Sequence, residues 1–260
     1  MPEIRVRVLV VGGGGAGLCA SIFLSSHGVE HLLVERHDST SNLPKAHYLN
    51  QRTMEIFRQH AVADPVYAAG TPIEHAEWVT WQTTLGGDGQ LDAKILYKMD
   101  CSGGGQLKDV YSKDSACPPS NLPQLRLEPI LRAEAERRAP GAIRFSHELA
   151  TMTEDSEGVT ATIHNKQTGQ TYTVRADYLV AADGGKTVGA MVGVNMVGAR
   201  NLFDMVSTHK TADFSQWWEE GADGPVRQPR RRRVSRKRRA GADGRHGAST
   251  PRSGCSTSHS

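Results

Sequence analysis

Cysteine is scarce in this chain and is not arranged for metal or dithiol chemistry. Only four cysteines occur in 260 residues, and no two of them form a Cys-x-x-Cys pair. Because no Cys/His cluster has metal-ligand spacing either, the sequence predicts no metal site. Widely spaced cysteines are typical of reduced thiols in a cytosolic protein, and they argue against a disulfide reductase. The four residues are Cys19, Cys101, Cys117 and Cys255.

Long apolar runs are also missing. The first apolar run, Val6–Val11, is too short for the core of a signal sequence or for a membrane span, and no basic leader segment precedes it. We therefore expect a cytoplasmic protein with no membrane partner.

Acidic and aromatic residues are nearly absent from the C-terminal end. Eleven of the 31 Lys and Arg residues but only one of the 28 acidic residues lie at or after Pro225, so positions 1–224 carry a formal charge of −7 and positions 225–260 one of +10. The tail has too little apolar surface to offset its chain entropy, and we predict disorder there. Its run Arg230–Arg239 leaves nucleic-acid binding open, but an Arg run without aromatics is more typical of a solvated tail, and we expect no specific nucleic acid.

The N-terminal part has the pattern of a strand–helix–strand unit. Arg5–Val11 is β-branched and apolar, as a strand buried on both faces should be. Leu18–His27 has helical periodicity and is followed by Gly28, a typical glycine after a helix C-terminus. His31–Glu35 reads as a second buried strand. About thirty residues is the usual size of a βαβ unit.

The link between the first strand and the helix carries the strongest motif, Gly12-x-Gly14-x-x-Gly17, and Glu35 ends the second strand. This context is the one that a dinucleotide-binding turn requires. Free N–H groups at the helix start would bind a diphosphate, and Glu35 would accept hydrogen bonds from ribose hydroxyls. A purely structural glycine turn is the alternative, and the motif alone does not choose between FAD and NAD. The predicted binding residues here are Gly12, Gly14, Gly15, Ala16, Gly17 and Glu35.

The rest of the patterned sequence mixes helices and strands. Asn50 is predicted to cap a helix that runs to about Ala63, with Met54, Phe57 and Ala61 on one face. Residues 70–122 are irregular and Gly-rich, with one strand candidate. A helix and three extended runs follow, the last two joined by a hairpin loop at 165–169. In chain order these elements are Glu77–Thr83, Leu125–Arg138, Ile143–Met152, Val159–His164 and Tyr172–Val180.

Three later segments carry a family resemblance. Residues 43–56 (LPKAHYLNQRTMEI) resemble the stretch after the second strand in class A flavoprotein aromatic monooxygenases of the p-hydroxybenzoate and phenol hydroxylase type. Residues 121–128 (NLPQLRLE) resemble that family's second flavin-contacting helix start, and residues 177–184 (DYLVAADG) resemble its Asp-Gly motif. The amino-acid sequence of these segments most resembles the 2,4-dichlorophenol 6-monooxygenase branch. The resemblance covers about residues 4–215, with the motifs in family order.

The resemblance implies FAD as the cofactor and assigns roles to single residues. Lys45 stands where the family has an Arg near the diphosphate, Gln124 would bind the ribityl or ring region, and Asp183 the ribityl chain. Gly184 would let the backbone approach the diphosphate, and Arg36 would flank the adenosine. Each has a plainer interpretation: a surface charge for Lys45, a polar helix start for Gln124, and an ordinary turn for Asp183-Gly184.

His47 is the candidate catalytic residue. By the same resemblance it faces the substrate, where a histidine of near-neutral pKa could deprotonate a phenol and so activate the ring for oxygen transfer. An exposed loop histidine is the alternative. The implied reaction uses NADPH as reductant, O2 as oxidant and a phenolic substrate, without a separate nicotinamide-binding domain; the sequence contains no second fingerprint for one.

The family pattern breaks near Gln216. Members are much longer and carry a third flavin motif, Gly-Asp, which we do not find, so we expect a truncated or frame-shifted chain. FAD affinity should then fall, the flavin hydroperoxide should decay to peroxide instead of transferring oxygen, and apolar surface should be exposed. The alternative function is thus an FAD-binding remnant without hydroxylase activity.

We expect an α/β fold: an FAD-binding Rossmann-type domain with an inserted β-meander and a partial mixed-sheet substrate domain. The predicted FAD-binding domain is 1–188, interrupted by a substrate-domain segment at 70–122. The start of the substrate domain is 189–224, and the basic tail is 225–260. The sequence does not indicate an oligomeric state.

Overall fold

The structure is a computed structural model, and it describes residues 3–84, 88–185, 187–195 and 197–198. The predicted disordered tail at 225–260 and most of the predicted segment at 189–224 lie outside these residues. Among the described residues, none of the helices combines the length and the apolar character that a membrane crossing would need.

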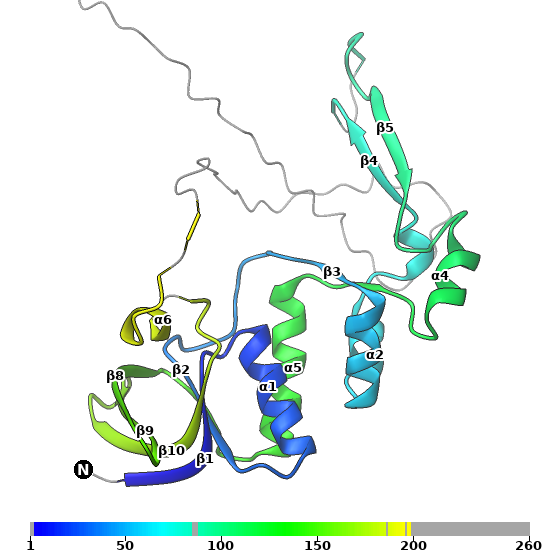
Figure 1. The fold of residues 1–260 in the computed structure, drawn as a ribbon. Helices are drawn as coiled ribbons and strands as arrows, with labels where there is room; N and C mark the ends of the chain where they lie inside the picture. Colours follow the sequence, from blue (N-terminus) through cyan, green and yellow to red (C-terminus); the bar gives the residue numbers. More distant parts are fainter. Residues whose placement is uncertain (1–2, 85–87, 186, 196, 199–260) are drawn as a thin grey trace, which may run out of the picture. The chain divides into compact units, whose positions relative to one another are not determined.

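A six-stranded sheet organises the fold, in the order β7-β2-β1-β10-β9-β8 (Figure 1). Strand β1 lies in the middle and pairs in parallel with β2 and β10, while β2 pairs in parallel with β7. Strands β8, β9 and β10 form an antiparallel meander. The predicted α/β fold with an inserted meander is confirmed. The strands are β1 (Glu3–Val11), β2 (His31–Glu35), β7 (Ile143–Phe145), β8 (His147–Asp155), β9 (Gly158–Asn165) and β10 (Thr171–Ala181).

Both faces of the parallel strands are buried, which explains their continuous apolar sequences. On one face, Val8, Val10 and Leu33 pack against two helices, α1 (Gly15–Ser26) and α5 (Gln124–Arg138). The two helices lie side by side (Figure 1). On the other face, the meander residues Ile163 and Val174 belong to a second core cluster with Leu9, Leu32 and Val34.

The helix predicted at residues 50–63 is shorter than expected. Asn50 caps α2 (Gln51–Gln59) by accepting a hydrogen bond from the Thr53 N–H at 2.8 Å, as predicted. The helix then ends, because Ala61 adopts a left-handed conformation (φ 56°) and is exposed instead of lying on the buried face. Pro65 has no N–H to donate to the preceding turn, so it could not lie inside a longer α2. It fits the first turn of the next helix, α3 (Ala63–Ala69).

Residues 70–122 contain more regular structure than their sequence indicates. The predicted strand is present as β4 (Trp78–Gln82), but it pairs with β5 (Ile95–Asp100), which was not predicted. Strand β5 was missed because its two faces are alike: five of its six residues are exposed, so the sequence has no inside–outside alternation. A short 3-10 helix, η1 (Ile73–His75), and α4 (Lys108–Asp114) complete the segment.

The predicted run Ile143–Met152 is two strands. Ser146 is buried with a φ of 60°, and this left-handed residue turns the chain from β7, which pairs with β2, into β8, which pairs with β9. The hairpin loop predicted between β9 and β10 is confirmed: Gly169 has a φ of 72°, and the Asn165 N–H donates to the Gln170 carbonyl.

Candidate cofactor site

The site is built on the turn between β1 and α1, where the glycines are required by close backbone approach. Gly12 has a φ of 112°, and a Cβ atom there would lie 2.4 Å from the carbonyl oxygen of Ala182, at the end of β10. A Cβ atom on Gly17 would lie 1.8 Å from the carbonyl oxygen of Gly12. The motif therefore stands at a strand-to-helix junction, as its sequence context predicts.

The N–H groups of this turn fall into two sets. The Gly13 N–H donates to Glu35 at 2.6 Å, and the Gly15 N–H donates to Glu128 at 3.2 Å. Within the part of the chain that the structure describes, the N–H groups of Gly14 and Ala16 have no hydrogen-bond partner. Unpaired amides and the positive end of the α1 dipole together favour an anion at this point.

Glu35 lies over the glycine turn. One carboxylate oxygen accepts from Gly13, and the other accepts from the backbone N–H of His37 at 2.8 Å and contacts its ring. The carboxylate is thereby fixed at the end of β2, the place from which a ribose would be reached. Arg36 follows directly and is exposed, so its predicted position beside the adenosine stays a prediction.

Two of the predicted segments are brought together by backbone pairing. Short strand β3 (Tyr48–Leu49) pairs with β6 (Ser120–Asn121). The pairing continues before β3 and after β6, because the Gln124 N–H donates to the carbonyl of Ala46 at 2.8 Å and the Leu122 N–H donates to that of His47 at 2.7 Å. The segment that carries Lys45 and His47 therefore runs alongside the start of α5.

The side chains of Lys45 and His47 are both exposed. The His47 Nδ1 atom lies 2.9 Å from the Asn121 Oδ1 atom. Since that oxygen can only accept, His47 donates from Nδ1 and keeps Nε2 as the nitrogen that can accept a proton.

Glu128 is a site residue that the sequence analysis did not single out. It lies on α5, one turn after Gln124, and its side chain is only 1% exposed. Its carboxylate accepts hydrogen bonds from Gly15, from the Ser41 N–H at 2.8 Å and from the Gln124 side-chain amide at 2.5 Å. The available signal was its place among the buried residues Leu127 and Leu131, where a carboxylate is unusual.

Asp183 and Gly184 form the turn that follows β10. The Ala182 N–H donates to the Val11 carbonyl at 2.8 Å, so this turn stands beside the glycine turn. Burial raises the pKa of Asp183, but hydrogen bonds from the N–H groups of Thr187, Val188 and Gly185 outweigh it, and the pKa lies below its usual range. Asp183 therefore stays ionised while it orders the start of α6 (Val188–Met191).

These residues fit an adenine dinucleotide with a diphosphate. The open amides of Gly14 and Ala16, the dipole of α1 and the absence of Cβ atoms at Gly12 and Gly17 form a turn that phosphate oxygens can approach closely. In contrast, no group of three or more His, Cys, Asp or Glu residues suited to a metal occurs among the described residues.

Comparison with known proteins agrees with this geometry. The FAD binding domain family model matches residues 5–238. Phenol 2-monooxygenase of Pseudomonas sp. (strain EST1001) is 33% identical over 228 residues, which cover 88% of this chain and 35% of that protein. The 2,4-dichlorophenol 6-monooxygenase of Delftia acidovorans is 33% identical over 215 residues, covering 82% of this chain and 36% of that protein.

A solved structure of a flavin-dependent monooxygenase is also similar to this chain. The flavin-dependent monooxygenase PieE, crystallised with FAD and substrate, matches with a TM-score of 0.72 and 41% identity, over 78% of this chain and 34% of that one. The chain thus spans about a third of the length of the relatives it matches. It belongs to the FAD-binding domain family of monooxygenases, in which phenol 2-monooxygenase and 2,4-dichlorophenol 6-monooxygenase are its relatives.

Proposed function

We propose that this chain supplies the FAD-binding part of an NAD(P)H-dependent monooxygenase that hydroxylates a phenolic substrate with O2. The observation that carries the proposal is the convergence of three segments on the start of α1: the glycine turn, the end of β2 and the start of α5. When bound, FAD would accept electrons from NADPH and use them to activate O2.

The chain's own residues would hold the cofactor at defined points. The open N–H groups of Gly14 and Ala16, on either side of Gly15, would bind the diphosphate. Glu35 would bind the adenosine ribose, beside Arg36. Lys45 would neutralise diphosphate charge as a point charge, without the two-pronged geometry of an arginine. At the flavin end, Gln124 and Asp183 would bind the ribityl and ring region, with Gly184 allowing close backbone approach.

His47 would act as the base towards the substrate. Its Nδ1–H is held by Asn121, which leaves Nε2 free to take the phenol proton. Removing that proton makes the ring electron-rich, and this is the step that a hydroxylase of phenols has to assist.

The domain division follows the same proposal. Residues 1–188 form the FAD-binding domain, interrupted at 70–122 by a segment of the substrate domain, and residues 189–224 begin the rest of that domain. We place the protein in the cytoplasm, with the phenol, NADPH and O2 as its small-molecule partners.

A second candidate is FAD binding without hydroxylation. It is favoured by the length of the chain, which spans about a third of its relatives. Hydroxylation requires an enclosed site that excludes water, and a site left open to water would yield peroxide in place of a hydroxylated ring.

The purified chain tests both candidates. Bound oxidised flavin gives a yellow protein, and oxidation of NADPH that is faster with phenols and yields a hydroxylated product supports the monooxygenase. A yellow protein that makes only peroxide supports the second candidate. A colourless protein that takes up no FAD on titration contradicts both. As a control, Gly12→Val places side-chain atoms against the Ala182 carbonyl and should remove flavin binding.

A further inference from the structure

Glu128 presents an unusual arrangement inside the proposed cofactor site. A buried carboxylate is costly unless several donors compensate for the water that it loses. Here three donors supply this compensation: with the residue 1% exposed, one oxygen accepts from Gln124 and Gly15 and the other accepts from Ser41.

The three hydrogen bonds are unequal, and the difference indicates what the carboxylate does. The bonds from the Gln124 side chain (2.5 Å) and the Ser41 N–H (2.8 Å) are short, whereas that from Gly15 is long, at 3.2 Å. Glu128 therefore makes its shorter hydrogen bonds to Gln124 and Ser41, which lie outside the start of α1. Ser41 lies in the loop that leads to Lys45, and Gln124 is the residue proposed to contact the flavin.

We propose that Glu128 is a positioning residue of the cofactor site, which fixes the Gln124 amide and the loop after β2 against the glycine turn. This inference rests on the proposed FAD site. The opposite effect is also physically conceivable: a carboxylate beside a diphosphate repels it. The two effects predict opposite changes in the Kd for FAD when the charge is removed, so one substitution separates them.

The first test is Glu128→Gln, measured by titrating the full chain with FAD. The amide keeps the size of the side chain but replaces one acceptor by an NH2 group, which then faces an N–H donor. We expect the Kd for FAD to rise about tenfold or more, the usual scale for losing a charged buried hydrogen bond. Glu136→Gln is the matched control, because Glu136 lies on the same helix and pairs with Arg132 at a partly exposed position.

A double-mutant cycle shows whether the effect passes through Gln124. If Glu128 positions this amide, Gln124→Ala and Glu128→Gln weaken FAD binding by less together than the product of their separate effects. A general loss of structure would not give this coupling. The thermal midpoint of each variant without FAD is measured in parallel to separate unfolding from weaker binding.

A third pair of variants leaves Glu128 in place, in case its substitution prevents folding. Ser41→Pro removes the N–H that the carboxylate binds, and Ser41→Ala keeps it. We expect the Kd for FAD to rise about tenfold for the proline variant relative to the alanine variant. Equal affinities for this pair would overturn the proposal, as would unchanged or tighter binding by Glu128→Gln or independent effects in the cycle. Failure of the unsubstituted chain to bind FAD would instead refute the proposed function.

Discussion

At the scale of single residues, the tightest constraint lies at Gly17. Its Cα faces the Gly12 carbonyl so closely that an added Cβ would lie 1.8 Å away, and a backbone oxygen cannot rotate aside as a flexible side chain can. Gly15, two residues earlier on the same helix, has no atom within 4 Å of such a Cβ. The two positions therefore form a matched pair.

We predict that Gly17→Ala lowers the free energy of unfolding by about 1–3 kcal/mol, because β1 and α1 must separate to admit the methyl group. Gly15→Ala should leave it unchanged or raise it by about 0.5–1 kcal/mol, since alanine is the better helix former. Urea unfolding of both variants measures the difference. Equal effects at the two positions would show that the strand–helix contact does not limit this turn.

Local spacing made part of the site predictable. The glycines and Glu35 could be found because a strand, a turn and a helix start place them together within one short stretch of chain. The role of Glu128 could not be predicted, because it depends on Ser41 and Gly15, which are far away in sequence. The roles of Lys45 and His47 stay predictions, since both side chains are exposed and depend on groups that would come with the cofactor or substrate.

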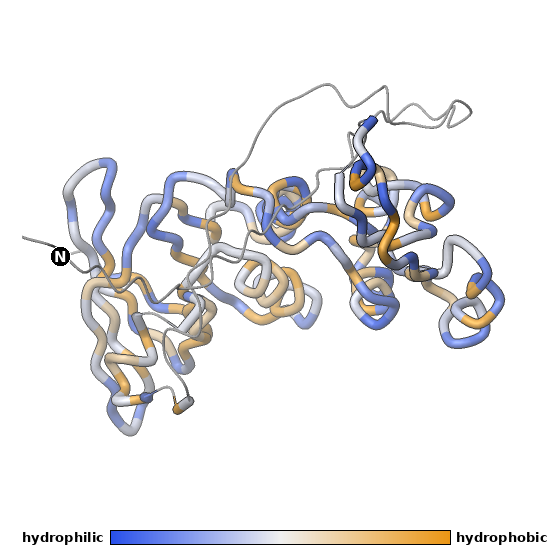
Figure 2. The backbone as a smooth tube through the Cα atoms, turned by 90° about the horizontal axis from the view of Figure 1, so that it is seen from above, coloured by the Kyte–Doolittle hydropathy of each residue, from blue (hydrophilic) through white to orange (hydrophobic). Residues whose placement is uncertain are grey.

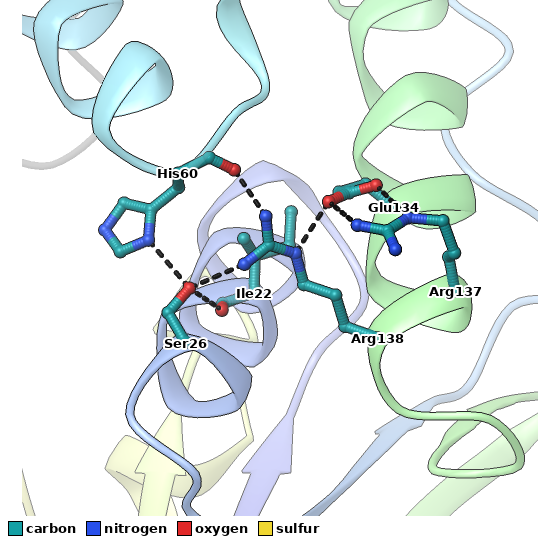
Figure 3. Close-up of polar contacts among 6 residues, drawn as sticks. All are labelled: Ile22, Ser26, His60, Glu134, Arg137 and Arg138. Atoms are coloured by element: carbon teal, nitrogen blue, oxygen red, sulfur yellow. Dashed lines mark hydrogen bonds and ion pairs between the residues drawn. The ribbon is translucent and has the colours of Figure 1, made fainter.

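At the scale of elements, three helices are joined by a polar network around Arg138 (Figure 3). Its guanidinium donates to Glu134 at 2.6 Å on α5, to Ser26 at 2.6 Å on α1 and to the carbonyl of His60, which follows α2. His60 also lies 2.8 Å from the Ser26 hydroxyl. Burial, then the nearby Arg138 charge, lowers the pKa of His60, so this histidine is neutral in the network.

Glu134 makes the network sensitive to acid. Hydrogen bonds from Arg137 and Arg138 lower the pKa of Glu134 from 4.5 to about 2. A carboxylate whose pKa is lowered by folding contributes stability above its unfolded pKa, and this contribution is lost as the pH falls from 4.5 towards 2. We predict that Glu134→Gln removes this part of the acid dependence, so that unfolding midpoints of variant and parent converge at low pH.

Urea midpoints measured across that range provide the check. Glu136→Gln, on the same helix but outside this network, controls for loss of a carboxylate from α5. A Glu134→Gln profile parallel to that of the parent throughout would contradict the assignment.

Most elements were predictable from apolar patterns and from the glycine and proline residues between them, and the exceptions share a cause. The parallel strands β1 and β2 have continuous apolar sequences, and α1 and α5 have glycine or proline close to both ends. Two predicted elements are interrupted in the structure, one at Ala61 and one at Ser146, and both are non-glycine residues with positive φ. Nothing in a local sequence marks such residues, because contacts distant along the chain hold them: the Ser146 N–H, for example, donates to His37.

At the scale of the whole described chain, apolar side chains are exposed on the β4–β5 hairpin. Ile95, Leu96 and Tyr97 are 57%, 65% and 58% exposed. Hydrophobic stretches occur throughout the described chain and are not confined to the sheet (Figure 2). Among the described residues β4 and β5 form a sheet of two strands, and exposed apolar patches favour association.

We predict that the double substitution Ile95→Thr/Leu96→Thr reduces self-association and the binding of an apolar dye. Threonine keeps the preference for a strand, so the free energy of unfolding should change by less than about 0.5 kcal/mol per site. Sedimentation at several protein concentrations and dye fluorescence provide the measurements. Unchanged dye binding would show that the exposed surface lies elsewhere.

The two carboxylates at the glycine turn also bear on which anions it admits. Glu35 and Glu128 each accept one amide N–H, and both bring a negative charge close to the open amides of Gly14 and Ala16. Any anion is attracted by these amides and by the α1 dipole but meets this repulsion, whereas the dinucleotide proposed here would also bring ribose hydroxyls that Glu35 could bind. We therefore expect the two acidic residues to favour the dinucleotide over free phosphate or sulfate.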